Sequence, residues 1–169
     1  MKFKLQFPDE HIVFWSGQYD YTVDEQIQTF ITPQAKERGF CYHADLIELC
    51  RWKSPRIQGH CTKNDPSFVI DVTKTALHTQ NEQFRIEVLR LLKGVNWPMA
   101  SVILHWCHRD PYPIIDFRAL WSLGIDPIPK YTFEFWWAYT CACRQIAEHV
   151  GVSMRVLDRA LWAYSKAKL

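Results

Sequence analysis

The sequence predicts an all-α fold for this 169-residue chain. From about residue 40 onward, apolar residues recur at the three- and four-residue intervals typical of amphipathic helices. Asp, Asn or Ser precedes several of these stretches and Gly follows some of them, as at helix ends. The only alternating, strand-like segment lies near the N-terminus. With 48% hydrophobic and 22% charged residues, the chain can bury a core.

An extended arm is expected at residues 1–35, ahead of a helical domain at 36–169. Every second side chain between residues 2 and 7 is apolar, which is a short strand-like pattern. The segment HIVFWS at 11–16 is interpreted as a second extended piece that packs on the body of the domain.

The first three helices are expected at about 41–52, 66–78 and 82–93. The first ends before a Ser-Pro pair, because proline disfavours helical angles in the residue before it. Asp65 and Asn81 occupy the N-cap positions of the other two. The stripe of the third helix expected to face the core consists of Phe84, Val88, Leu91 and Leu92.

Four further helices complete the predicted fold. Residues 98–107 are apolar on nearly all sides, which predicts a buried central helix. A short helix is expected from Asp116 to Gly124, and a long aromatic helix at about 133–150. Ser153 caps the last helix, whose predicted apolar face consists of Leu157, Ala160, Leu161 and Tyr164.

The charge of the chain is nearly balanced, at +2, but basic residues gather in RWKSPRIQGHCTK, residues 51–63. This stretch holds four Lys or Arg side chains, no acid, and Trp52. Basic side chains around an indole suit a nucleic-acid strand, whose phosphates and bases they can contact. A solvated surface loop explains the same composition, and both interpretations stay open.

Six cysteines are scattered along the chain, without a CxxC pair or a zinc-ligand spacing. They are expected to be reduced, mostly buried thiols in a cytoplasmic protein, with no metal and no iron–sulfur cluster. The N-terminus carries charges where a secretory signal needs an apolar run, and no apolar segment reaches membrane-spanning length.

A tight hairpin is expected where the helix at 82–93 ends at Gly94 and the next helix begins by Pro98. Gly94 takes left-handed angles freely, and Asn96 is of the type that tolerates them next best. Pro98 suits the first turn of a helix. The unpaired N–H groups gathered in such a turn can bind a phosphate oxygen without reading bases. Asp116, farther along, is either a helix cap or an acid presented to a ligand.

Together, LLKGVNWPMASVIL and YPIIDFRA resemble the helix-hairpin-helix DNA glycosylases of base excision repair. Members carry an LPGVGxxTAxxIL hairpin, a Gly/Pro-rich loop and an essential Asp 22 residues after the first hairpin glycine, the same separation as from Gly94 to Asp116. The resemblance covers about residues 81–124. Asn96 replaces the second hairpin glycine, and Pro98 stands where bifunctional members carry the lyase lysine. The iron–sulfur cysteines of some members are absent.

The resemblance implies a two-lobed helical bundle with the hairpin at about 82–107, an Asp loop at 108–118 and C-terminal helices at 133–169. It implies a monofunctional DNA glycosylase, without lyase activity or cofactor, that acts on damaged or modified double-stranded DNA and is nucleoid-associated if bacterial. Asp116 is the expected catalytic residue. The expected DNA contacts are Gly94, Val95, Asn96, Trp97, Lys53, Arg56 and Arg118, with Trp52 in the base pocket. For Trp97 a buried packing role stays open, and for Arg118 an ion pair with an internal acid stays open.

Two other interpretations stay open. Residues 146–161 have the spacing of a helix-turn-helix element, from which Arg155 and Arg159 are expected to project into a DNA groove. Alternatively, the chain is an interaction protein on a glycosylase-like scaffold, which the near-neutral charge favours. The sequence leaves the excised base and the oligomeric state undetermined.

Overall fold

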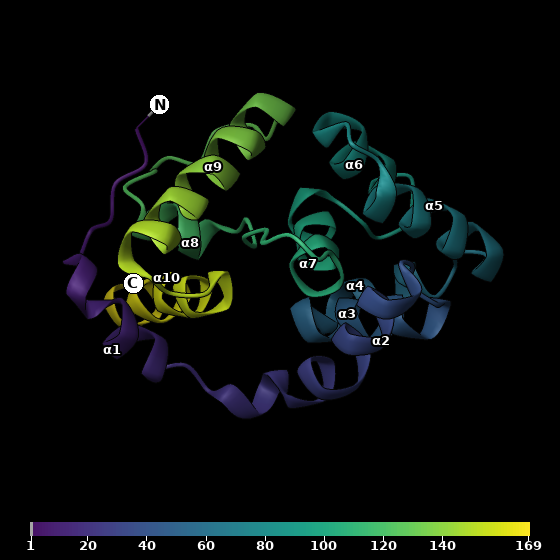
Figure 1. Ribbon diagram of the computed structural model, residues 1–169, viewed down its shortest axis with the longest axis horizontal. Helices are drawn as coiled ribbons and strands as arrows, with labels where there is room; N and C mark the ends of the chain where they lie inside the picture. Colours follow the sequence, from purple (N-terminus) through teal and green to yellow (C-terminus); the bar gives the residue numbers. More distant parts are fainter. Residues whose placement is uncertain (1) are drawn as a thin grey trace. The chain divides into compact units, whose positions relative to one another are not determined.

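The computed structural model describes residues 2–169, which are 69% helical and contain no strand (Figure 1). The predicted all-α fold class is therefore confirmed for these residues. Within the same range, no helix combines the length and apolar character that crossing a bilayer requires.

The chain divides into two compact units. The terminal unit combines the residues up to Asp20 with Pro111–Leu169, and the central unit is Tyr21–Asp110. Each unit therefore has its own core.

The central unit is built around α7, Trp97–Cys107. Nine of the eleven α7 side chains are buried, which confirms the predicted central helix. It packs against α2, α3 and α6. The elements before it are η2 (Tyr21–Asp24), η3 (Ile27–Ile31), α2 (Thr32–Arg38), α3 (His43–Lys53), α4 (Pro55–Cys61), α5 (Pro66–His78) and α6 (Glu82–Leu89).

The terminal unit is organised by α10, Met154–Lys168, which packs against three other helices, α1, α8 and α9. Its buried face includes Leu157, Ala160 and Leu161, as the sequence predicts. The remaining elements are η1 (Asp9–His11), α1 (Ile12–Gly17), α8 (Phe117–Ser122) and α9 (Phe133–Val150).

Helix caps follow the sequence closely. Asp65 accepts a hydrogen bond from the Phe68 N–H at 3.0 Å and begins α5. Side-chain oxygens of Asn81, Asp116 and Ser153 cap α6, α8 and α10 in the same way. The predicted starts of these helices are confirmed, because a cap is a local signal that needs no tertiary contact to be recognised.

The N-terminal arm is only partly extended. The Lys4 and Gln6 N–H groups donate to the carbonyls of Leu123 and Ser122, each at 3.0 Å, without forming a strand. The extended conformation predicted for residues 11–16 is wrong, since His11 ends η1 and residues 12–16 lie in α1. Ile12 and Ser16, which lie one helical turn apart, are the two buried residues of α1. Their four-residue spacing fits a helix that buries one face.

The stripe predicted for α6 is wrong in half of its members. Phe84 is 50% exposed and Leu91 is 63% exposed. The buried face of α6 instead includes Arg85 and Ile86, because the Arg85 guanidinium turns inward to the carbonyls of Ala76 in α5 (2.7 Å) and of Thr79, the residue after α5. This orientation moves the apolar face by one to two positions along the helix.

Candidate functional site

The connection between α6 and α7 is longer than the predicted tight hairpin. α6 ends at Leu89 and α7 begins at Trp97, with turns between them. Gly94 has the expected left-handed φ of +82°. A Cβ atom there would lie 2.8 Å from the Cys61 sulfur and 3.1 Å from the Cys61 nitrogen. Glycine is therefore required both by the backbone angle and by this close approach.

Asn96 does not take the left-handed angles predicted for it. Its φ and ψ are −99° and −174°, which is extended backbone, and its side-chain oxygen accepts a hydrogen bond from the Met99 N–H at 3.1 Å. Asn96 is thus the N-cap of α7, a role that requires β-region angles. Pro98 lies in the first turn, as expected.

Three N–H groups of this turn have no hydrogen-bond partner within residues 2–169. Lys93 donates to the Asn64 side chain at 2.7 Å, and Val95 donates to the Leu92 carbonyl at 3.1 Å. By contrast, the backbone N–H groups of Gly94, Asn96 and Trp97 donate to no other group within residues 2–169. They lie at the positive end of an 11-residue helix, where an anionic oxygen is stabilised.

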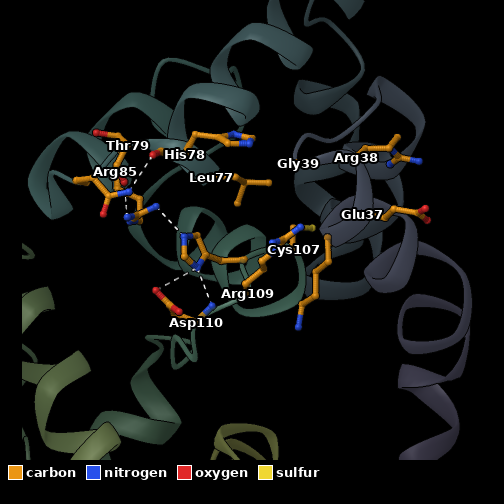
Figure 2. Close-up of a pocket in the computed structure, with 13 residues that line it drawn as sticks. Glu37, Arg38, Gly39, Leu77, His78, Thr79, Arg85, Cys107, Arg109 and Asp110 are labelled. Atoms are coloured by element: carbon orange, nitrogen blue, oxygen red, sulfur yellow. Dashed lines mark hydrogen bonds and ion pairs between the residues drawn. The ribbon is translucent and has the colours of Figure 1, made fainter.

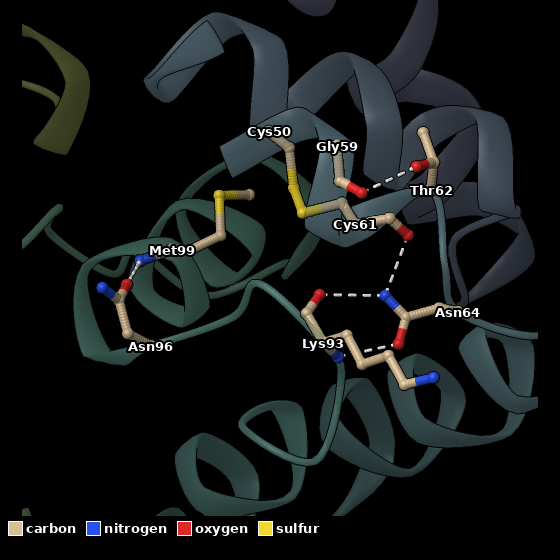
Figure 3. The surroundings of a disulfide bond; sticks show 8 residues. All are labelled: Cys50, Gly59, Cys61, Thr62, Asn64, Lys93, Asn96 and Met99. Atoms are coloured by element: carbon tan, nitrogen blue, oxygen red, sulfur yellow. Dashed lines mark hydrogen bonds between the residues drawn. A yellow bond between two sulfur atoms is a disulfide. The ribbon is translucent and has the colours of Figure 1, made fainter. Parts of the chain in front are cut away.

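Asn64 holds this turn in place (Figure 3). Its amide nitrogen donates to the Lys93 and Cys61 carbonyls, both at 2.9 Å, while its oxygen accepts from Lys93 N–H. The side chain is buried and all of these contacts are internal. Asn64 has no local sequence signal, because nothing in the spacing connects it to a residue 29 positions later.

A disulfide joins Cys50 to Cys61 beside the turn (Figure 3). The expectation that all cysteines are reduced thiols is therefore wrong for this pair. α3 and α4 pack on each other and bring the two sulfurs together, although the spacing of eleven residues matches no common motif. Gly94 lies against Cys61, so the disulfide is part of the surface on which the turn packs.

Val95 and Trp97 are buried, so their side chains are not exposed contacts. The Arg90 guanidinium lies over the Trp97 ring, 4.5 Å from its centroid. The packing role that an indole commonly takes is thus the role observed for Trp97.

The basic stretch 51–63 is mostly helical, because it forms the end of α3 and all of α4. Trp52 donates its indole N–H to Asp24 at 3.1 Å and meets Trp106 edge-on at 5.5 Å. Lys53 is half-buried at the end of α3, and Arg56 is exposed on α4. Arg56 is thus accessible to solvent, whereas the indole N–H of Trp52 already has a hydrogen-bond partner.

In the terminal unit, Asp116 is a half-exposed residue that caps α8. Its carboxylate oxygen accepts the Ala119 N–H at 2.9 Å. The segment before it is fixed at Ile114, whose N–H donates to Asp158 at 3.2 Å and whose carbonyl accepts from the Tyr139 hydroxyl at 2.8 Å. Contacts on both sides therefore restrain the position of Asp116.

Two tyrosines lie in the field of the Asp116 carboxylate. Burial and then the Asp116 charge raise the pKa of Tyr131. Burial also raises the pKa of Tyr139, with a smaller effect of the same carboxylate. Both phenols stay neutral at neutral pH and can donate hydrogen bonds. Tyr131 was missed by the sequence analysis, since no motif connects it to Asp116.

Arg118 follows Asp116 on α8 and stacks between aromatic rings. Its guanidinium carbon is 5.0 Å from the Phe117 ring centroid and 5.6 Å from that of Trp162. One buried guanidinium nitrogen, Nη1, has no hydrogen-bond partner within residues 2–169. Because this nitrogen is buried, its missing partner is not by itself a sign of phosphate binding.

The structure places the hairpin residues in the central unit and Asp116 and Arg118 in the terminal unit. The predicted projection of Arg155 and Arg159 is wrong. Arg159 is only 7% exposed, and Arg155 forms an ion pair with Asp158 at 2.5 Å. A buried arginine cannot reach a DNA groove, so the helix-turn-helix interpretation loses its recognition residues.

A pocket of about 320 Å³ in the central unit was not foreseen (Figure 2). It lies where the C-terminal ends of α2, α5 and α7 meet. Its wall contains His108, which is buried and whose Nε2 lies 2.7 Å from an Arg85 nitrogen. Burial and then the Arg85 charge lower the pKa of His108 to about 4. The basic side chains of this pocket, such as Arg85, lie near the C-terminal ends of the three helices. Basic residues commonly compensate the partial negative charge at such ends.

Among residues 2–169, no group of three or more His, Cys, Asp or Glu side chains is arranged to hold a metal ion. Comparison with models of known protein families, with curated proteins and with solved structures found no match to this chain.

Proposed function

We propose that the protein binds DNA through the α6–α7 turn and is a monofunctional DNA glycosylase of the helix-hairpin-helix type. It would hydrolyse the N-glycosidic bond of a damaged or modified base. The observation that carries the proposal is the set of N–H groups of Gly94, Asn96 and Trp97, which have no internal partner at the start of α7. The resemblance of residues 81–124 to the glycosylases supports it.

The turn would bind a backbone phosphate and so fix the register of the protein on DNA. Asn64 contributes by holding the Lys93 backbone, which keeps the next amides in a constant orientation. Lys53, Arg56 and Arg118 are proposed as further phosphate contacts. The indole N–H of Trp52 is bonded to Asp24, so a contact of Trp52 with a base would have to be by ring stacking.

Asp116 is the proposed catalytic residue. Breaking an N-glycosidic bond builds positive charge on the sugar, which a nearby carboxylate stabilises. The same carboxylate can orient and deprotonate the attacking water. A base must leave the helical stack before it reaches such a group, so a flipped nucleotide is the expected substrate.

Asp116→Asn is the decisive variant, because Asn caps a helix about as well as Asp. The variant should keep the bond to Ala119 N–H and the fold, while removing the negative charge. We expect base release to fall by about 10²-fold or more with DNA affinity retained. The assay uses a panel of duplexes with single damaged or modified bases, and reads the formation of abasic sites.

Asp116→Ala is the matched control, since it removes both charge and cap and should destabilise the protein by about 1 kcal/mol. Equal base release by the wild type and Asp116→Asn would contradict the catalytic role of Asp116.

Lyase activity is not expected, because Pro98 has no amine. Lys93 and Lys53 are the remaining candidate amines, and the Lys93 ammonium lies 3.4 Å from the Lys63 carbonyl. Borohydride treatment in the presence of abasic DNA should trap no covalent adduct. An adduct lost in Lys93→Gln or Lys53→Gln would overturn the monofunctional assignment.

A non-catalytic DNA-binding module or interaction protein is the second candidate. Its support is the cap formed by Asp116, which accounts for this carboxylate without catalysis, and the net charge of only +2. DNA binding without base release from any duplex of the panel would favour the module. The absence of DNA binding would favour the interaction protein.

A further inference from the structure

Two free cysteines of the central unit lie side by side. The sulfur atoms of Cys41 and Cys107 are 3.4 Å apart, and both side chains are buried. Cys41 lies in the connection between α2 and α3, whereas Cys107 is the last residue of α7. A disulfide sulfur pair is separated by about 2.0 Å, so bond formation requires a movement on the order of 1.4 Å.

The backbone at both positions is held by hydrogen bonds. Cys41 N–H donates to the Thr73 hydroxyl at 2.9 Å, which itself donates to the Val69 carbonyl at 2.8 Å. At the end of α7, His108 N–H donates to the Leu104 carbonyl at 3.0 Å. The two sulfurs therefore stay near each other in the folded protein, which favours their reaction over that of more distant thiols.

Cys107, although buried, borders a pocket of the central unit. It lines the pocket of about 320 Å³, with Arg85 and Arg109 on other parts of the wall (Figure 2). Cys41 does not line this pocket. A small reagent that enters the pocket therefore meets Cys107 first.

We propose that Cys41 and Cys107 form a second disulfide site, oxidised by a low-molecular-weight disulfide that enters through this pocket. The Cys107 thiol attacks the disulfide RSSR, which gives a mixed disulfide at Cys107 and releases one RSH. The Cys41 thiol then attacks the Cys107 sulfur, which closes the Cys41–Cys107 bond and releases the second RSH. Both protein thiols are oxidised, the small disulfide is reduced to two thiols, and the two thiol protons leave on them.

The surroundings of Cys41 agree with this order. The contact with Cys107 and then burial raise the pKa of Cys41 well above its usual value. Cys41 is therefore protonated at neutral pH, so it is not the thiol that reacts first.

The bond would join the α2–α3 connection to the end of α7, across 66 residues of sequence. A cross-link over such a separation restricts the unfolded chain strongly. We expect the melting temperature of the oxidised protein to exceed that of the reduced pair by about 4 °C or more.

The test is oxidation of the folded protein with 2-hydroxyethyl disulfide. Thiols are then alkylated after denaturation without reductant and counted by mass spectrometry. The count should fall from four, at Cys41, Cys107, Cys141 and Cys143, to two. Trypsin releases residues 39–51 and 94–109, and chymotrypsin, which cuts after Tyr42, separates Cys41 from Cys50. A peptide pair joined through Cys41 and Cys107 identifies the bond.

Cysteine variants test which thiols form the bond. Cys141→Ser should still lose two thiols on oxidation, because Cys141 lies in the other unit. Cys41→Ser should retain the reagent as a mixed disulfide on Cys107. A wild-type count that stays at four, or a loss of thiols without the Cys41–Cys107 peptide pair, would overturn the proposal.

Discussion

At the scale of single residues, Gly94 combines two constraints that its sequence context reveals only in part. Its position in a turn predicts the left-handed angle, which the structure confirms at +82°. The close approach to Cys61 comes from a different part of the chain and has no local signal.

The two constraints at Gly94 can be separated by comparison with Gly151. Gly151 has a similar φ of +73°, but no atom lies within 4 Å of the position that a Cβ would take. Gly151→Ala should lower the free energy of unfolding by about 1–2 kcal/mol through the backbone angle alone. Gly94→Ala should cost about 1–3 kcal/mol more, since the methyl group meets Cys61. Urea unfolding of both variants measures the difference, and equal losses would contradict the close approach.

The residues that the sequence predicted correctly are those with local roles. Asp65, Asn81 and Ser153 each bond to an N–H three positions later, within the reach of a sequence pattern. Asn64 acts on Lys93, which the pattern of neighbouring residues does not encode. The Cys50–Cys61 bond was missed for a similar reason, because it depends on how α3 packs on α4.

At the scale of helices, the errors arise where a polar group takes a core position. The prediction for α6 followed its apolar residues, but Arg85 occupies the buried face. Its guanidinium binds the carbonyl groups at the end of α5 and also contacts His108 after α7. One side chain of α6 therefore joins the ends of α5 and α7, and a search for hydrophobic periodicity does not detect such a polar contact.

The buried contact between Arg85 and His108 predicts a pH dependence of stability. His108 faces Arg85, with Asp110 at 4.0 Å and Glu82 nearby, and its pKa is lowered to about 4 from an ordinary value of 6.5. Between pH 4 and pH 6.5, His108 is protonated in the unfolded chain but neutral in the folded protein. The contribution to stability is therefore present above pH 6.5 and is lost as the pH falls towards 4.

From pH 7 to pH 5 the loss due to His108 should be about 2 kcal/mol in the free energy of unfolding. Urea unfolding at both pH values measures it. His108→Gln should remove this part of the pH dependence. His60→Gln, an exposed position on α4, is the control and should keep it. An unchanged slope in His108→Gln would show that other groups cause the dependence.

At the scale of the whole molecule, the sequence predicted the all-α class because its helices are marked by local periodicity and caps. The grouping of the N-terminal twenty residues with Pro111–Leu169 was not predicted, since it depends on contacts such as those of α1 with α10. Of the candidate site, the turn and the Asp116 cap follow from sequence. Which N–H groups of the turn lack an internal partner follows only from the contacts of its other residues, such as Lys93 and Val95.

The charge distribution of the molecule predicts a moderate salt dependence of DNA binding. The net charge is +2, and the proposed phosphate contacts include three cationic side chains, Lys53, Arg56 and Arg118. Three neutralised phosphates correspond to a slope of about −2.7 in a plot of log K against log salt concentration. The affinity for a short undamaged duplex should then fall about 40-fold between about 50 and 200 mM salt. Fluorescence anisotropy at several salt concentrations gives the slope.

Two arginines of the basic stretch make this measurement specific. Arg56 is exposed, and Arg56→Gln should reduce the slope by about 0.9 because one released counterion is lost. Arg51 already forms an ion pair with Glu48 on α3, so Arg51→Gln should leave the slope nearly unchanged. If the wild type binds duplex DNA with no salt dependence, or if both variants behave alike, α4 does not contact the phosphate backbone. The interaction protein would then account better for the near-neutral charge of the chain.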